Sequence, residues 1–330
     1  WEIVEGYRIK IEAEENLVWF GDWLPRDTDI PLEEGWNNIA FFGQDELPAD
    51  GPEPYVLGPI IDDVILAKDV HGRFMLPRVG FSNMPPWRPT QGYQVNVGQD
   101  VVLNYPEGPE EGDFARGSRI EIPDADRHWL MRDLTDANMS VVVSSIDGVK
   151  PNDHTEIAAF NTAGELVGAG VVGTEGRCGL AVWGDDPTTE TVEGLRAGEA
   201  FELRLWISGV EADLSVASNL EGELIYNADG LSVVDVSADV ALPTEYFMSA
   251  GYPNPFNSST RIDFGLPETA KVKIQVYDLS GRMVTTLING RYEAGHHFVS
   301  WDAKGLSSGL YFIEMRGRAF NQVRKIVLTK

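Results

Sequence analysis

Cysteine is almost absent from this 330-residue chain, whose single thiol is Cys178. An intrachain disulfide is therefore excluded, and the apolar run around Cys178 predicts a buried, unreactive side chain. Basic residues are also scarce, 26 against 52 acidic ones, which gives a net charge of −26. A field of that sign repels phosphate backbones, so nucleic acid is not an expected partner. Apolar runs stay far below the length of a membrane span, and none is expected.

Familiar catalytic and cofactor motifs are missing as well. The chain has no glycine-rich nucleotide loop, no Cys-x-x-Cys and no His-Glu-x-x-His. His154 lies between Asp153 and Glu156, but no nearby serine has the spacing of a nucleophile elbow. His296 and His297 are adjacent on an expected strand and would face opposite sides. We therefore expect a protein that is not an enzyme and has no cofactor, calcium excepted.

Short alternating apolar runs separated by glycine-rich turns dominate the sequence, and helical periodicity is not apparent. The expected class is all-β: tandem antiparallel β-sandwich or barrel-like modules that end in an immunoglobulin-like Greek-key sandwich. The expected divisions are residues 1–24, the closing half of a repeat unit; 25–112, a β-rich repeat module; 113–124, a linker; 125–240, a β-sandwich module; and 246–330, the terminal sandwich.

An internal repeat lies at the start of the chain. Trp1, Gly6, Tyr7, Ile9 and Ile11 recur, with the same spacing, as Trp87, Gly92, Tyr93, Val95 and Val97. A repeated spacing indicates one structural unit used twice. The first copy has only its closing half. Either the chain is the C-terminal part of a longer polypeptide, or residues 1–24 complete a sheet in this molecule or a neighbour. The second alternative makes the five residues of the first copy, Trp1, Gly6, Tyr7, Ile9 and Ile11, candidate assembly residues. With no signal peptide and no initiator methionine, we expect a mature or trimmed product.

Individual elements can also be predicted. In the repeat module we expect a short helix around residues 54–61 and a hairpin from 64–67 to 73–76. In the next module the expected strands are 139–143, 156–160, 166–172, 180–183, 200–206 and 222–226. Residues 237–245 would link this module to the terminal sandwich. Most of the tryptophans fall at expected strand starts, where they would pack cores.

The terminal region combines a strand, Lys271–Tyr277, with turn chemistry in Asp278-Leu279-Ser280-Gly281. Its motif residues are Tyr252, Pro253, Asn254, Pro255, Phe256, Asn257, Gly281, Gly295, Trp301, Asp302, Gly309, Tyr311 and Lys325. This pattern resembles the type A C-terminal sorting domain of type IX secretion cargo, and the upstream modules resemble those of large secreted surface proteins. The resemblance implies an immunoglobulin-like sandwich, recognition by the outer-membrane secretion machinery, and a location outside the cell or on the surface of a Gram-negative bacterium. In many relatives the domain is cleaved and the cargo is anchored to surface polysaccharide.

Acidic residues gather in two stretches of the second module, and they suggest calcium. Asp147, Asp153 and Glu156 form one group, and Asp185 and Asp186 form the other. Calcium is bound by six to eight oxygens on close-spaced loops, so a site is expected if these loops meet. The alternative is a solvated acidic rim. Separately, Trp19 and Trp23 are candidates for a carbohydrate platform.

We therefore expect a non-enzymatic, secreted or cell-surface structural protein that carries a sorting domain. Two alternatives remain open. The chain could be the subunit of an extracellular filament or surface array that associates head to tail with its own copies. It could also be an ancillary carbohydrate-binding or spacer region of a larger hydrolase or adhesin.

Overall fold

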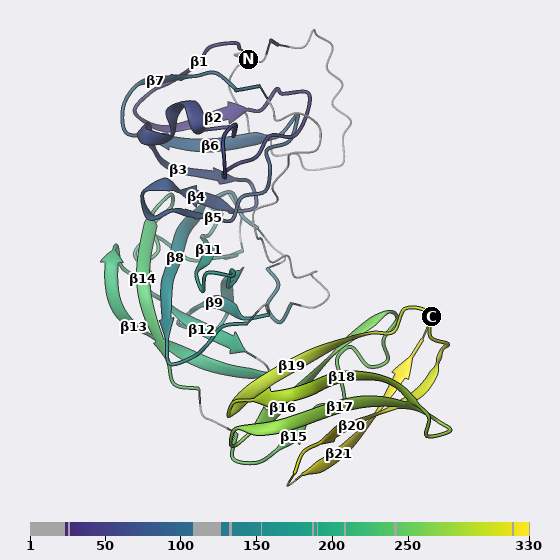
Figure 1. Cartoon of the computed structure of the whole chain (residues 1–330). Coiled ribbons are helices and arrows are strands. Elements are labelled where there is room, and N and C mark those ends of the chain that lie inside the picture. Colours follow the sequence, from purple (N-terminus) through teal and green to yellow (C-terminus); the bar gives the residue numbers. More distant parts are fainter. Residues whose placement is uncertain are drawn as a thin grey trace. The chain divides into compact units, whose positions relative to one another are not determined.

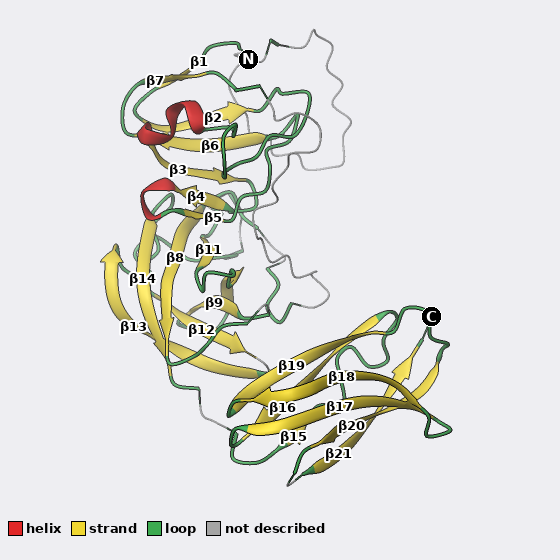
Figure 2. Cartoon of the chain, in the orientation of Figure 1, coloured by secondary structure: helices red, strands yellow, loops and turns green. Residues whose placement is uncertain are grey.

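The computed structural model describes residues 24–25, 27–107, 127–131, 134–152, 154–186, 188–189, 191–207, 209–240, 243–318 and 320–329 (Figure 1). The fold is nearly all β, with 53% strand and 3% helix, which confirms the predicted class (Figure 2). It divides into two compact units: residues 1–204 with 215–237, and residues 205–214 with 238–330. The five candidate assembly residues, Trp19, Trp23, Asp153 and the predicted linker lie outside the described residues. Across the described ranges, no helix has the length and apolar character to cross a membrane.

A five-stranded sheet forms the first module of unit 1. Its order is β2 (Gly35–Ala40), β6 (Gly92–Val97), β3 (Val64–Asp69), β4 (Phe74–Leu76) and β5 (Phe81–Ser82). A separate pair joins β1 (Ile30–Leu32) to β7 (Val101–Leu103), and two short 3-10 helices are η1 (Gly58–Asp63) and η2 (Pro77–Val79). The predicted hairpin is confirmed as β3 and β4. The predicted short helix is η1, which begins four residues later than expected because Pro59 suits a first helical turn.

The second copy of the repeat motif supplies much of this module's core. Along β6, Tyr93, Val95 and Val97 are buried while the residues between them are half-buried, as the alternation predicts. The Trp87 ring stacks on the Tyr93 ring with centroids 3.7 Å apart, and it meets Phe41 edge-on at 6.2 Å. These contacts confirm that Trp87 packs a core.

The second module is a closed barrel. Its strands follow the order β10 (Leu166–Val171), β11 (Cys178–Trp183), β8 (Asn138–Asp147), β14 (Leu231–Ala238), β13 (Val210–Glu221), β12 (Phe201–Ile207) and β9 (Glu156–Asn161). The sandwich predicted for residues 125–240 is therefore a closed barrel, the other form that the predicted class allowed. The expectation of wholly antiparallel pairing is wrong, because β14 pairs with β8 in parallel. Alternation in a sequence gives the two faces of a strand, but it does not name the neighbouring strand. Cys178 is fully buried, as predicted.

Two further corrections concern strands of this barrel. Residues 222–226, predicted as a strand, form only an isolated bridge between Ala200 and Ile225. The chain there turns at Gly222, whose φ is +63°. The long strand lies just before it, in β13, and the expected link at 237–245 begins inside β14. Strand β13 escaped prediction because its apolar residues are sparse, and Val216 and Leu220 are 41% and 58% exposed.

Within unit 1 the first sheet packs on the barrel. Leu66, Phe74, Leu76 and Phe81 form a buried cluster with Val142 and Val233 of the barrel. Polar contacts surround it: Asn83 Nδ2 donates to Gly179 O at 3.0 Å, and an Arg177 guanidinium nitrogen donates to Val79 O at 2.8 Å. The sheet thus buries both faces, one in its own core and one against the barrel.

The terminal sandwich has seven strands in two sheets. One sheet has the order β15 (Phe247–Met248), β16 (Ser259–Leu266) and β19 (Gly295–Asp302). The other has the order β18 (Met283–Tyr292), β17 (Ala270–Asp278), β20 (Gly309–Arg316) and β21 (Asn321–Leu328). Along β17, Val272, Ile274 and Val276 are buried, and Lys271 and Lys273 are exposed, as the predicted half-buried strand requires. Gln275 departs from the alternation, because it is buried as well.

The barrel's closure generates a stability prediction for Gly168. A Cβ at this position would lie 2.5 Å from Ala181 O and 3.2 Å from the Val182 Cα, both backbone atoms of the neighbouring strand. Because backbone atoms cannot rotate away, Gly168→Ala should destabilise unit 1 by about 1–3 kcal/mol. Gly98→Ala is the matched control, since its Cβ would meet nothing closer than 3.8 Å. Urea unfolding of both variants measures the difference, and equal midpoints would contradict the close approach of β10 and β11.

Candidate functional site

The segment Tyr252–Asn257 is attached to the last strand of the chain. Asn254 Oδ1 accepts from Val327 N at 3.0 Å, and Asn254 Nδ2 donates to Lys325 O at 3.3 Å. Phe256 continues the contact: its amide donates to Val327 O at 2.9 Å, and its carbonyl accepts from Thr329 N at 2.7 Å. The two ends of the motif pattern, far apart in sequence, therefore meet in one structural feature.

Three aromatic residues of the motif form the centre of the terminal core. Phe256, Trp301 and Tyr311 are buried, and Trp301 contacts both of the others, with ring centroids 5.1 and 5.4 Å away. The Tyr311 hydroxyl donates to Ser307 O at 2.8 Å, which satisfies the polar end of a mostly buried ring. These three motif residues therefore stabilise the domain by packing its core.

Other motif residues face solvent. Tyr252 is 72% exposed, and its backbone alone is held, by mutual hydrogen bonds with Arg261. Lys325 and Asn257 are exposed as well, and Lys325 lies on β21, the strand to which the Tyr252 segment is attached. An exposed aromatic ring with no part in the core is available to a partner. The exposed motif residues are therefore the candidate recognition surface.

The turn after β17 is organised by one carboxylate. Asp278 Oδ1 accepts from the Ser280 hydroxyl at 2.6 Å, from Ser280 N at 2.9 Å and from Arg282 N at 3.1 Å. Gly281 has a φ of +79°, as the predicted turn requires. The hydrogen bond from Ser280, followed by those from the backbone and Arg282, lowers the pKa of Asp278 from 3.8 to about 2.

The acidic residues proposed for calcium mostly have other partners. Glu156 is buried, and its two oxygens accept from His128 N at 2.7 Å and Trp129 N at 3.1 Å. Asp185 accepts from Glu193 N, and Asp186 accepts from Thr188 N. Asp147 is exposed at the end of β8. In the part of the chain that the structure describes, no three His, Cys, Asp or Glu side chains are grouped as metal ligands. Calcium binding stays a prediction.

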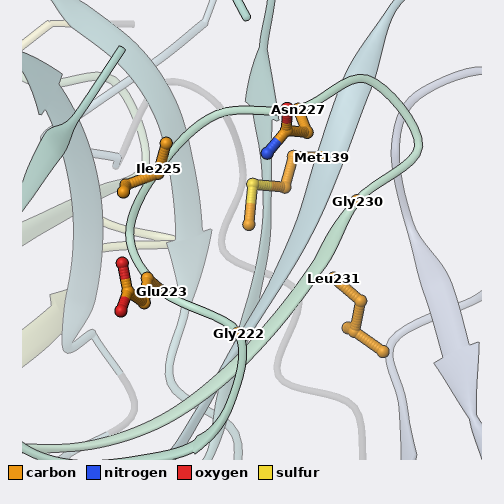
Figure 3. Close-up of a pocket in the computed structure, with 7 residues that line it drawn as sticks. All are labelled: Met139, Gly222, Glu223, Ile225, Asn227, Gly230 and Leu231. Carbon is orange, nitrogen blue, oxygen red and sulfur yellow. The ribbon is translucent and has the colours of Figure 1, made fainter. Parts of the chain in front are cut away.

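A small pocket opens on the barrel where the turn before β14 faces β8. Its volume is about 220 Å³, and its lining residues are Met139, Gly222, Glu223, Ile225, Asn227, Gly230 and Leu231 (Figure 3). Met139 projects between the loop that carries Ile225 and Asn227 and the start of β14 (Figure 3). The lining offers one carboxylate and one amide, without a nucleophile beside a base. This lining favours no catalytic reaction.

Next to this pocket lies a polar cluster that the sequence analysis missed. Lys68 on β3 is buried, forms an ion pair with Asp229, and lies 3.4 Å from Asn138 Oδ1. The only sequence signal is a lysine that occupies an apolar phase of a strand, two residues after Leu66. Asp229 and Asn138 carry no such signal, because their proximity to Lys68 arises from the packing of two modules.

The Asp278 turn gives a prediction on pH dependence. Because the pKa is lowered in the folded state, the stabilisation by this carboxylate is present above pH 3.8 and is lost as pH falls toward about 2. Asp278→Asn keeps an acceptor for the turn amides but loses the charge. The melting temperature of the wild type should therefore exceed that of the variant at pH 6, and the gap should close by pH ~2. A gap that is constant with pH would contradict the assigned pKa.

Comparison with known proteins identifies the terminal unit. Residues 250–329 match the family model described as secretion system C-terminal sorting domain. No curated protein matches the chain. Among solved structures, a biofilm-associated protein BSP domain is 12% identical with a TM-score of 0.20, over 53% of this chain and 25% of that one. A tetra-tandem repeat from the extending region of a large adhesion protein is 13% identical with a TM-score of 0.19, over 80% and 66%.

This chain thus spans about a quarter of the first of these structures and about two thirds of the second. The matched residues include strands β16 to β21 of the sandwich and the motif segment that begins at Tyr252, while β15 lies just before them. The terminal sandwich is therefore a type IX secretion sorting domain, and the protein that carries it is secreted or displayed at the cell surface.

Proposed function

We propose that this chain is a non-catalytic structural segment of a surface protein, in which two β modules form a spacer and the terminal sandwich is the export signal. The observation that carries the proposal is the division of the motif residues. Phe256, Trp301 and Tyr311 build the sorting domain, whereas Tyr252, Asn257 and Lys325 remain exposed for recognition.

The upstream modules support the spacer role through their construction. They pack on each other through a buried apolar cluster and flanking hydrogen bonds, which favours a stiff unit. The pocket on the barrel lacks a catalytic set. A net charge of −26 favours solubility outside the cell.

Export should depend on the exposed aromatic residue of the motif. Tyr252→Ala removes a side chain that is 72% exposed, so the melting temperature should change little while surface display falls several-fold. Val323→Ala is the matched control, since Val323 is 51% exposed on the same domain but belongs to no motif. Cell fractionation and surface labelling in a host with the secretion machinery provide the measurement. If the Tyr252→Ala variant is displayed as well as the wild type, Tyr252 is not part of the recognition surface.

A second candidate function is self-assembly, and the repeat motif favours it. The second copy forms β6, which has strand neighbours on both sides, β2 and β3. The first copy, Gly6–Ile11, has the same alternation. A strand formed there would also need neighbouring strands to pair its backbone N–H and C=O groups. A neighbouring chain could supply them, and a head-to-tail contact of this kind would build a filament.

Light scattering with negative-stain imaging of the purified chain separates the two functions. A monomer favours the spacer. Regular polymers that disappear when residues 1–24 are deleted favour assembly through the first repeat copy. Polymers that persist after the deletion would contradict assembly through the first repeat copy.

A further inference from the structure

The buried lysine of β3 has an unusual position in the molecule. Lys68 is 1% exposed and projects from the same face of β3 as Leu66, toward the barrel. Its ammonium group lies 4.8 Å from the centre of the Trp36 ring. A lysine amine held in apolar surroundings is costly to keep charged, and desolvation is one way in which proteins turn lysine into a nucleophile.

Two barrel residues face this amine, and they differ in chemistry. Asn138, the first residue of β8, is 1% exposed, and its side-chain carbonyl oxygen is 3.4 Å from Lys68 Nζ. Asp229 forms the ion pair with Lys68, but its side chain is 47% exposed. The amide is thus enclosed with the amine, while the carboxylate reaches both the amine and water.

The backbone holds Asp229 and Asn138 in this arrangement. Asp229 N donates to Asn138 O at 3.0 Å, and Ser140 N donates to Gly230 O at 2.9 Å. Asp229 has a φ of +59°, a conformation that few residues other than glycine adopt. Such backbone strain is found preferentially at functional sites. The amine, the amide and the carboxylate are therefore placed by the packing of two modules, independently of the proposed function.

We propose that Lys68 and Asn138 form an intramolecular isopeptide bond, with Asp229 as the proton carrier. Asp229 accepts a proton from Lys68 Nζ, and the free amine attacks Cγ of Asn138. Asp229 then returns the proton to Nδ2 of Asn138. The Cγ–Nδ2 bond breaks, and Asp229 passes the second Nζ proton to the departing ammonia, which leaves as ammonium. A new Nζ–Cγ amide with one hydrogen on Nζ remains. No redox change occurs, and Asp229 ends in its starting state.

This bond would join β3 of the first module to β8 of the barrel and close a loop between residues 70 positions apart. A covalent closure of that length restricts the unfolded chain, as a disulfide does in a protein that has two cysteines. This chain has one cysteine, so a lysine–asparagine amide is a cross-link its composition permits. For a protein exposed outside the cell, the bond would resist both heat and pulling force.

Mass spectrometry of the wild-type full chain tests the proposal directly. The intact mass should be about 17 Da below the sequence mass, because one ammonia is lost. Cyclisation at Asn289-Gly290 would give the same loss, so the deciding observation is a branched tryptic peptide that contains Lys68 and Asn138. Trypsin should also fail to cleave after Lys68.

Matched variants assign the roles. Lys68→Arg keeps the positive charge but cannot form the amide, so its mass should equal the sequence mass. Asp229→Asn should likewise show no mass loss while retaining the wild-type near-ultraviolet circular dichroism spectrum. A cross-link in Asp229→Asn would overturn the role of Asp229.

Two results obtained with the folded wild-type chain would contradict the proposed Lys68–Asn138 bond. The first is recovery of linear peptides with a free Lys68 and an unmodified Asn138, which would make the cluster a permanent ion pair. The second is a loss of about 18 Da with a branch between Lys68 and Asp229, which would place the amide on the carboxylate.

Discussion

Burial of both faces of a single sheet is the constraint on which unit 1 depends. In β3, Ala67 faces the module's own core, while Leu66 and Lys68 face the barrel. Strand geometry makes this division unavoidable, because successive side chains point to opposite sides. The second face can avoid water only if another module covers it. Apolar burial of this kind therefore fixes the barrel against the sheet and brings distant polar residues together.

Close backbone approach is the second requirement, and glycine meets it. At Gly168 of β10 and Gly179 of β11 a Cβ would lie within 2.6 Å of a backbone or ring atom. The same absence of a side chain lets Phe81 of the first module pack over Gly179. The absence of a side chain at Gly168 lets β10 approach β11 closely, and its absence at Gly179 lets the first sheet pack on the barrel.

In the sorting domain, one motif serves two purposes. The Asn254 side chain and the Phe256 backbone attach the start of the domain to β21, and Trp301 joins Phe256 to Tyr311 in the core. The same motif contains residues that pack the core and residues that are exposed to solvent, where a partner can contact them. Only their burial separates them, and Tyr252 with Phe256 shows both cases four residues apart.

Sequence alone determined the all-β class, the strand Lys271–Tyr277 with its turn in the terminal sandwich, and the burial of Cys178, Trp87 and Trp301. Each of these follows from local alternation, turn residues or side-chain chemistry. The tertiary structure decided what depends on strand partners: the closed barrel, the parallel pairing of β14 with β8, and strand β13 with its exposed residues. It also decided the position of Lys68 beside Asn138 and Asp229. Periodicity reports which face of a strand is buried, but it carries no information on which distant segment covers that face.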